Sequence, residues 1–217
     1  SVSGDIARKW AGLPLNPNGR ANGSCLRPYY NGDDVVGRMR DEWLIDLPLN
    51  LNEEEAAQFE VIYQHLSESV YDPNDNPLKT LREARMIARD VHAKERWWEP
   101  YWPRPELREK LKYTALYLAT PETAEHRFFS ILDSCILPDK NLVVFPTWNF
   151  VLFGVLESSI HRIWASRAGT SLAERPRYTQ TTTVETFPFP EGLTPNIPAD
   201  QYADDPRAIA IAAAAAE

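Results

Sequence analysis

The sequence predicts a mixed α/β (α+β) fold, as a single compact domain with a small central sheet, flanking helices and a Pro-rich C-terminal tail. The 217 residues are 43% hydrophobic and 25% charged, which is ordinary for a globular protein with a sizeable core. Eighteen prolines divide the chain into short elements. Segments of helical period alternate with short β-branched and aromatic runs. We place the domain at residues 1–190 and the tail at 191–217.

The N-terminal half contains a clearly signalled helix. Asn52 can cap its start, and Glu55 follows at the position of a capping box. Four apolar side chains then fall at i, i+3, i+4 and i+7, on one helix face: Phe59, Ile62, Tyr63 and Leu66. The sequence YDPNDNP ends this helix, and residues 78–96 form a second, highly charged one.

Short strands are expected in both halves of the chain, and one long helix is expected in the C-terminal half. The expected strands cover Glu42–Leu47, 113–121, 127–133 and 141–145. Residues 153–168 predict one amphipathic helix whose inward side chains are Val155, Leu156, Ile160, Ile163 and Trp164. Residues 175–190 predict a strand that is polar on both faces. Asp205 and Pro206 start a last helix, which we expect to continue in a longer protein.

Several kinds of chemistry lack their sequence signatures. Two cysteines give neither a disulfide framework nor a CxxC metal motif, which favours a reducing, cytoplasmic setting. The four histidines are scattered, and no Gly-rich nucleotide loop or GxSxG motif occurs. There is no apolar run long enough to span a membrane and no signal peptide. We therefore expect no catalysis, no metal and no cofactor in this chain, and no membrane partner.

The charge distribution says more than the net charge of −8. Residues 41–76 carry ten acidic residues and no Lys or Arg, so the basic residues are confined to other segments. Seventeen of the 23 basic residues are Arg, whose planar fork suits phosphates and guanine edges. The alternative is that this excess of Arg reflects genome composition alone.

Four segments are candidates for a contact surface. In ATPETAEHRFF, Thr120, Thr123, His126 and Arg127 surround a strand–loop junction. The Thr hydroxyls and Arg127 could hold phosphates there, or the threonines could be local caps beside an ordinary surface Arg. Arg162 and Arg167 lie on the flank of the helix at 153–168, where solvated charges are the default. The aromatic run RWWEPYWPRP could stack on bases or form a hydrophobic plug. Trp148 and Asn149 could approach a groove or could pack and cap.

Four motifs occur in a fixed order: NGSCLRPYYNGDDVVGRMRDEWLIDL, LATPETAEHRFF, FGVLESSIHRIWA and PRYTQTTTVETFPFP. Together, from about residue 20 to 190, they resemble the target-recognition domain of the MmeI-like DNA methyltransferases of restriction-modification systems. The phage-defence (BREX-like) methyltransferases are similar. That family joins an adenine-N6 methyltransferase, often with a nuclease, to a domain that reads DNA.

The resemblance implies a division of labour. S-adenosylmethionine and the catalytic Asn/Asp-Pro-Pro-Tyr motif would belong to a missing methyltransferase domain of the same prokaryotic, cytoplasmic protein, and double-stranded DNA would be the partner. Bases would be read by Arg175, Arg177, Thr179, Gln180 and Thr181. The physics agrees, because Arg can pair with guanine, Gln with adenine and Thr with the thymine methyl group. Arg127, Arg162 and Arg167 would contact phosphates.

Two other functions stay open at this point. The first is a protein-interaction scaffold that uses the acidic face of residues 41–76 and the aromatic cluster. The second is a small enzyme whose site carries no sequence motif, which would show as a pocket with perturbed ionisable groups. Arginines 127, 162, 167, 175 and 177 gathered on one face would favour DNA recognition instead.

Overall fold

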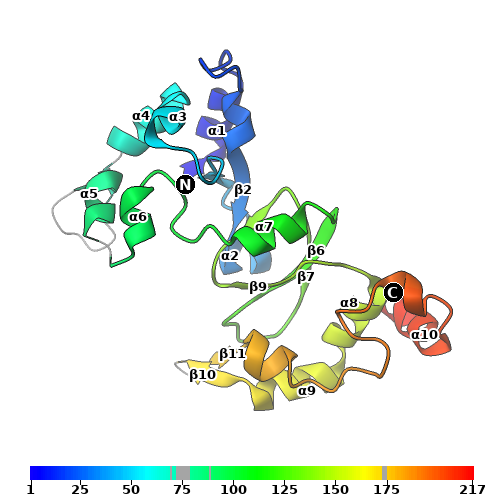
Figure 1. Ribbon diagram of the computed structural model, residues 1–217. Helices are drawn as coiled ribbons and strands as arrows, with labels where there is room; N and C mark the ends of the chain where they lie inside the picture. The colour runs from blue at the N-terminus through cyan, green and yellow to red at the C-terminus, as the bar shows by residue number, and fades with distance from the viewer. Residues whose placement is uncertain (69, 72–78, 88, 173–174) are drawn as a thin grey trace. The chain divides into compact units, whose positions relative to one another are not determined.

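The computed structural model describes residues 1–68, 70–71, 79–87, 89–172 and 175–217. They form short helices and small antiparallel sheets (Figure 1), so the predicted mixed α/β fold class is confirmed. The chain divides into two compact units. Unit 1 comprises residues 1–29 and 41–104, and unit 2 comprises residues 30–40 and 105–217. The domain boundary predicted at residue 190 stays a prediction.

Unit 1 is built from short strands and helices. Its strands are β1 (Val2–Ser3), β2 (Leu26–Tyr30, whose last residue belongs to unit 2), β3 (Glu42–Ile45), β4 (Val70–Tyr71) and β5 (Lys79–Thr80). Its helical elements are α1 (Gly4–Ala11), the 3-10 turn η1 (Asn22–Cys25), α3 (Glu53–Ala57), α4 (Glu60–Glu68), α5 (Leu81–Met86) and α6 (Val91–Glu95). Strand β3 pairs antiparallel with β1 and with β2.

Local sequence signals set the helices of unit 1. The capping box of Asn52 and Glu55 forms as predicted, but the single helix expected to follow it is divided at residues 58–59 into α3 and α4. The apolar face of α4 is buried through Ile62 and Leu66. The single helix predicted over 78–96 is instead two short helices, each with its own cap at Thr80 or Asp90. Two parts of these predictions lie outside the described residues: positions 72–77, where the first helix was expected to end, and positions 78 and 88 of the second helix.

The aromatic run of unit 1 is buried at its first two aromatic residues and exposed at the next two. Trp97 and Trp98 are buried in the core that α4, β2 and β3 share, and they pack edge to face. The next two aromatic side chains, Tyr101 and Trp102, are exposed. This burial supports the structural alternative for the first pair and leaves the second pair at the surface.

Unit 2 contains the remaining elements. Its strands are β6 (Leu116–Pro121), β7 (Ser130–Asp133), β8 (Leu137–Pro138), β9 (Leu142–Phe145), β10 (Thr170–Leu172) and β11 (Arg175–Arg177). Its helical elements are α2 (Gly32–Val36), α7 (Pro105–Leu111), α8 (Phe150–Glu157), α9 (Ser159–Ala168), the π-helical turn η2 (Gln180–Val184), the 3-10 turn η3 (Ala199–Tyr202) and α10 (Pro206–Ala215).

A three-stranded sheet in the order β7-β6-β9 organises unit 2. Its central strand β6 is buried from Tyr117 to Pro121, because one face meets α7 side chains and the other meets those of α8 and α9. The expected strands at 113–121, 127–133 and 141–145 all exist, each shorter than predicted. Asn149 caps α8 by accepting from the backbone N–H of Leu152 at 2.8 Å, and Trp148 packs on the core.

The helix predicted over 153–168 is broken at Ser158, which has extended backbone angles (φ −62°, ψ 151°). The side chain of Ser158 accepts from the backbone N–H of His161 and so caps a new helix, α9. This restart rotates the apolar positions. Ile160 and Ile163, predicted to point inward, are 70% and 54% exposed, while His161 and Ala165 are buried.

The C-terminal segment, predicted as a Pro-rich tail, packs against α8 within unit 2. Asp205 and Pro206 start α10 as predicted. This helix lies along α8 (Figure 1), where Ile211 and Ala215 approach the position of Gly154. A Cβ at Gly154 would come within 2.9 Å of both side chains, so the close approach of the two helices depends on this glycine.

Candidate nucleic-acid interface

The candidate residues of unit 2 surround the end of β6, the loop that follows it, strand β11 and helix α9. A shallow pocket of about 350 Å³ opens between these elements. It is lined by residues from the loop, from one face of α9 and from β11: Ala124, Glu125, His126, Arg127, Arg162, Ala165, Ser166 and Pro176. The pocket therefore brings together two of the predicted phosphate contacts and the strand that carries the predicted base contacts.

Arg127 ties the end of β6 to β11. Its guanidinium donates to Thr120 Oγ1 at 2.9 Å, to the backbone oxygen of Pro121 and, at 3.5 Å, to that of Pro176. The same group stacks on the ring of Tyr178, with its carbon 4.7 Å from the ring centroid. Burial lowers the pKa of Arg127 to about 10, so the side chain stays charged at neutral pH. Its donors point to oxygens of the protein.

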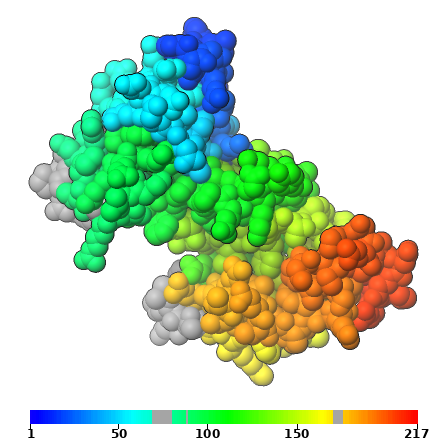
Figure 2. Space-filling model, in the orientation of Figure 1, coloured from blue at the N-terminus to red at the C-terminus, as the bar shows by residue number. Residues whose placement is uncertain are grey.

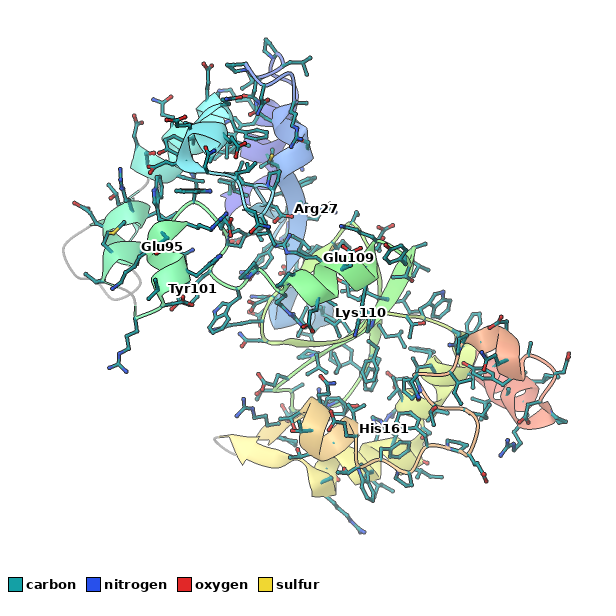
Figure 3. All side chains as sticks on the ribbon, viewed as in Figure 1. Arg27, Glu95, Tyr101, Glu109, Lys110 and His161 are labelled. Carbon is teal, nitrogen blue, oxygen red and sulfur yellow. The ribbon has the colours of Figure 1, made fainter. Side chains whose placement is uncertain are left out.

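His161 and Tyr178 form a buried hydrogen-bonded pair beneath this tie (His161 is labelled in Figure 3). Nδ1 of His161 lies 2.7 Å from the backbone oxygen of Leu156, so this nitrogen carries the proton and donates. Nε2 is then the acceptor for the hydroxyl of Tyr178, at 3.1 Å. Burial lowers the pKa of His161 to about 4 and raises that of Tyr178, which keeps both groups neutral.

Strand β11 is fixed by backbone and side-chain contacts to the loop after β6. The backbone N–H of Tyr178 donates to the oxygen of Glu122 at 2.6 Å, and Thr123 pairs with Arg177 as an isolated antiparallel bridge. The Nε of Arg177 donates to Oε1 of Glu122 at 2.7 Å, and its Nη2 lies 2.6 Å from the same oxygen. Glu122 is absent from the residues that the sequence singles out.

The polar segment after β11 is only partly extended, which corrects the strand predicted over 175–190. Extended backbone ends at Thr179, whose hydroxyl caps the π-helical turn η2 by accepting from the backbone N–H of Thr182. Gln180, Thr181 and Thr182 are exposed, and Figure 2 shows this golden segment on the visible face. Because the chain turns here, Thr181 does not lie on the same strand face as Arg177.

Arg162 and Arg167 lie on different sides of α9. They are five positions apart, and an α-helix turns about 100° per residue, so after one full turn their side chains project about 140° apart around the axis. Arg162 lines the pocket and pairs with Glu157 at 2.8 Å. Arg167 is exposed and has no ion pair within the described part of the chain. Of Arg175 the structure gives only the backbone, paired with Leu172 in the hairpin β10-β11, and its side chain lies outside the described residues.

A glycine sets the distance between α9 and β11. A Cβ on Gly169, at the C-terminal end of α9, would come within 2.7 Å of two backbone oxygens, those of Ala165 and Arg177. Such a contact would force one of the two backbones to move, so only glycine fits this approach. The sequence alone could not assign this role, because the contact joins residues on separate elements.

No group of three or more His, Cys, Asp or Glu side chains that could hold a metal ion occurs among the residues described. Within the same residues, no helix is both long enough and apolar enough to cross a membrane. The three groups with strongly perturbed pKa values in this region, Arg127, His161 and Tyr178, all have internal hydrogen-bond partners.

Comparison with known proteins gives one family and one fold relative. The sequence model of the family described as "MmeI, target recognition domain" matches residues 75–191, just over half of the chain. The solved structure of the Type IIL restriction-modification enzyme MmeI in complex with DNA has a similar fold, with a TM-score of 0.61 and 16% sequence identity. The match covers 88% of this chain and 23% of that chain. No curated protein sequence matches this chain significantly.

Proposed function

Because this chain belongs to the family of MmeI target recognition domains, we propose that it recognises a specific sequence in double-stranded DNA for an adenine-N6 DNA methyltransferase. Its motifs predicted this family. The chain spans less than a quarter of the enzyme with the similar fold, so the activity of the whole protein belongs to the proposal. Methyl transfer, S-adenosylmethionine binding and any DNA cleavage would then reside in other domains.

One observation supports the proposal best: an exposed polar segment lies beside a basic pocket and is anchored by buried contacts. Arg177, Gln180 and Thr181 are exposed on β11 and η2. The residues around them are fixed by the stack of Arg127 on Tyr178 and by the close approach of α9 at Gly169. Rigid placement of a few polar side chains is what base readout requires, because each hydrogen bond to a base edge is directional.

The readout residues remain the five named from the sequence, with different tasks. Arg177 and Gln180 have side chains suited to guanine and adenine edges, and Thr181 can contact a thymine methyl group. Thr179 uses its hydroxyl as a cap, so its contribution to readout would come through its methyl group and backbone. Arg175 precedes them on β11. The π-helical turn fits this role, since such turns are frequent at functional sites.

Phosphate contacts would be made by the exposed arginines of α9, Arg162 and Arg167, which would orient the duplex without reading its sequence. Because they lie on different sides of the helix, they would reach different phosphates. Arg127 was expected to join them, but its donors already point to three protein oxygens. We therefore assign Arg127 the task of holding β11 in place.

The test is a binding experiment with a library of duplex DNA whose core is randomised, followed by sequencing of the bound fraction. The wild-type chain should enrich a defined sequence, and its affinity should fall steeply with salt because phosphate contacts release counterions. Arg177→Ala should relax one base position by about 1–3 kcal/mol, whereas Arg162→Ala should weaken binding to all sequences alike.

Arg207→Ala provides the matched control, because it removes the same charge from α10 in the same unit, where Arg207 pairs with Asp205. It should change neither the enriched sequence nor the salt dependence. Absence of any enriched sequence with the wild-type chain would refute the proposal. Equal, uniform effects of Arg177→Ala and Arg162→Ala would refute the assignment of readout to β11.

A protein-interaction function has one observation in its favour. Tyr101 and Trp102 are 41% and 60% exposed in unit 1, next to the buried tryptophans. Replacing Trp102 with Ser should leave the enriched DNA sequence unchanged if this pair serves a protein partner. Loss of DNA binding in Trp102→Ser would instead assign the pair to the DNA interface.

A further inference from the structure

Glu122 and Arg177 meet in a geometry that leaves one edge of the guanidinium available. The Nε of Arg177 donates to Oε1 of Glu122 at 2.7 Å, and Nη2 lies 2.6 Å from the same oxygen. The carboxylate therefore occupies the side edge of the guanidinium, formed by Nε and Nη2. The end edge, formed by Nη1 and the outer hydrogen of Nη2, makes no hydrogen bond within the described part of the chain.

The end edge is the one that matches guanine. Two parallel N–H groups of Arg can donate together to O6 and N7 of guanine, and this bidentate contact is the commonest specific pairing in the major groove. An arginine on a flexible side chain must give up rotamer freedom to make that contact. A carboxylate that already holds the side edge reduces this loss, because the guanidinium plane is oriented before DNA arrives.

The backbone segments that carry Glu122 and Arg177 are both hydrogen-bonded to neighbouring segments. The backbone N–H of Glu122 donates to the oxygen of Asn141 at 2.7 Å, and its own oxygen accepts from Tyr178 at 2.6 Å. Thr123 forms an antiparallel bridge with Arg177. The Glu122 side chain is 25% exposed and the Arg177 side chain 46% exposed, so the pair is accessible to solvent.

We propose that Glu122 is a positioning residue for sequence recognition, which orients Arg177 so that its end edge reads a guanine. The inference rests on the proposed function, because it requires Arg177 to contact a base. An exposed ion pair by itself would contribute little to stability. The proposal therefore predicts an effect on base preference that a merely stabilising surface pair would not produce.

The test compares Glu122→Ala and Glu122→Gln with the wild-type chain in binding to duplex DNA with a randomised core. We expect Arg177→Ala to lower discrimination at one guanine position by roughly 5- to 150-fold. Glu122→Ala should lower discrimination at the same position by about two- to fivefold, the range for an exposed ion pair, with preference elsewhere unchanged. Glu122→Gln, which preserves the shape of the side chain, should act at the same position.

Two controls separate positioning from charge and from additive effects. Glu185→Gln removes the same charge from the exposed position after η2, and it should change affinity for all sequences alike without altering preference. The double variant Glu122→Ala/Arg177→Ala should discriminate at that position no worse than Arg177→Ala alone, because Glu122 acts only through Arg177.

The outcomes are distinct. A wild-type chain that enriches no sequence overturns the proposed function, and this inference with it. If the wild-type chain enriches a sequence, three results with the Glu122 variants overturn the role of Glu122 alone. The variants could keep the full preference, relax a different base position, or weaken binding to all sequences alike. Additive losses in the double variant overturn it as well.

Discussion

Lowering the pH from 7 to 5 should destabilise the fold through the protonation of one buried residue, His161. Its side chain is fully buried, and burial lowers its pKa to about 4, against an ordinary value of about 6.5 in the unfolded chain. Between these values the unfolded state binds more protons than the folded state. Stability is therefore fully present above pH 6.5 and falls as the pH drops toward 4.

The magnitude follows from the two pKa values. A folded pKa of about 4 and an unfolded pKa of about 6.5 give a loss of about 2 kcal/mol between pH 7 and pH 5, and of about 3 kcal/mol by pH 4. The main structural cause is burial, which would take the charged ring out of water. Protonated Nε2 cannot accept from the hydroxyl of Tyr178, and the added charge lies near the guanidinium of Arg127, which also lowers the pKa of His161.

Urea unfolding at a series of pH values measures this effect, with the pH dependence of the free energy of unfolding as the readout. His161→Gln should flatten the dependence between pH 7 and 5, whatever its effect on stability at pH 7. Burial also lowers the pKa of His65, in unit 1, so His65→Gln is the matched control. This variant should retain the part of the pH dependence of stability that is due to His161. Equal slopes for the wild-type chain and His161→Gln would refute the reasoning.

Three further predictions concern the contacts that hold β11 and η2. Gly169→Ala should destabilise the chain by about 1–3 kcal/mol in urea unfolding, because its Cβ would meet two backbone oxygens at 2.7 Å. Gly32→Ala, whose Cβ would meet a side chain at an ordinary 3.6 Å, should cost less than about 1 kcal/mol, and equal losses would contradict this account. Thr179→Ala should cost about 1 kcal/mol through loss of the cap, while Thr179→Ser should retain it; similar unfolding midpoints for both would count against the cap. Arg127→Lys should cost about 1–2 kcal/mol because an ammonium cannot reproduce the planar fork, while Arg167→Lys should change stability by less than about 0.5 kcal/mol. If Arg127→Lys is as stable as the wild-type chain but binds all DNA sequences more weakly, Arg127 would be assigned to phosphate contact instead.

Signals within a few residues predicted the local structure well. The capping box at Asn52 and Glu55 and the start of α10 at Asp205 and Pro206 form as expected. Each depends on a side chain and a backbone N–H two or three residues apart, so the interaction is encoded entirely in the local sequence. The three strands of the unit 2 sheet were also expected, because their apolar runs have the length of buried strands.

Periodicity failed where two helices meet without a gap. The apolar residues from 153 to 168 fit one helix, yet Ser158 both ends α8 and caps α9. A serine inside an apolar pattern is an acceptable helix residue and also a good cap, so the pattern could not choose between the two. The choice depends on packing, since burial of His161 and Ala165 requires the rotated start of α9.

The threonine-rich segment shows a second limit of sequence patterns. β-branched residues favour strands, and this preference predicted an extended chain through residue 190. The structure overrides it after Thr179, because tertiary contacts support the π-helical turn. Thr183 is buried, and its backbone oxygen accepts from Nε1 of Trp164 at 3.2 Å. Neither contact could be inferred from the spacing of threonines.

The residues that hold the candidate interface together lie far from it in sequence. Glu122 and Arg177 are 55 residues apart, and Arg127 and Pro176 are 49 apart. Arg177, Gln180 and Thr181 are exposed, whereas Tyr178 and Thr183, between and beside them, are fully buried. Buried residues that stabilise the fold therefore alternate along this segment with exposed polar residues that are available for recognition. Exposed positions can therefore change without loss of the fold, provided that the anchors and the loop at Glu122 stay in place.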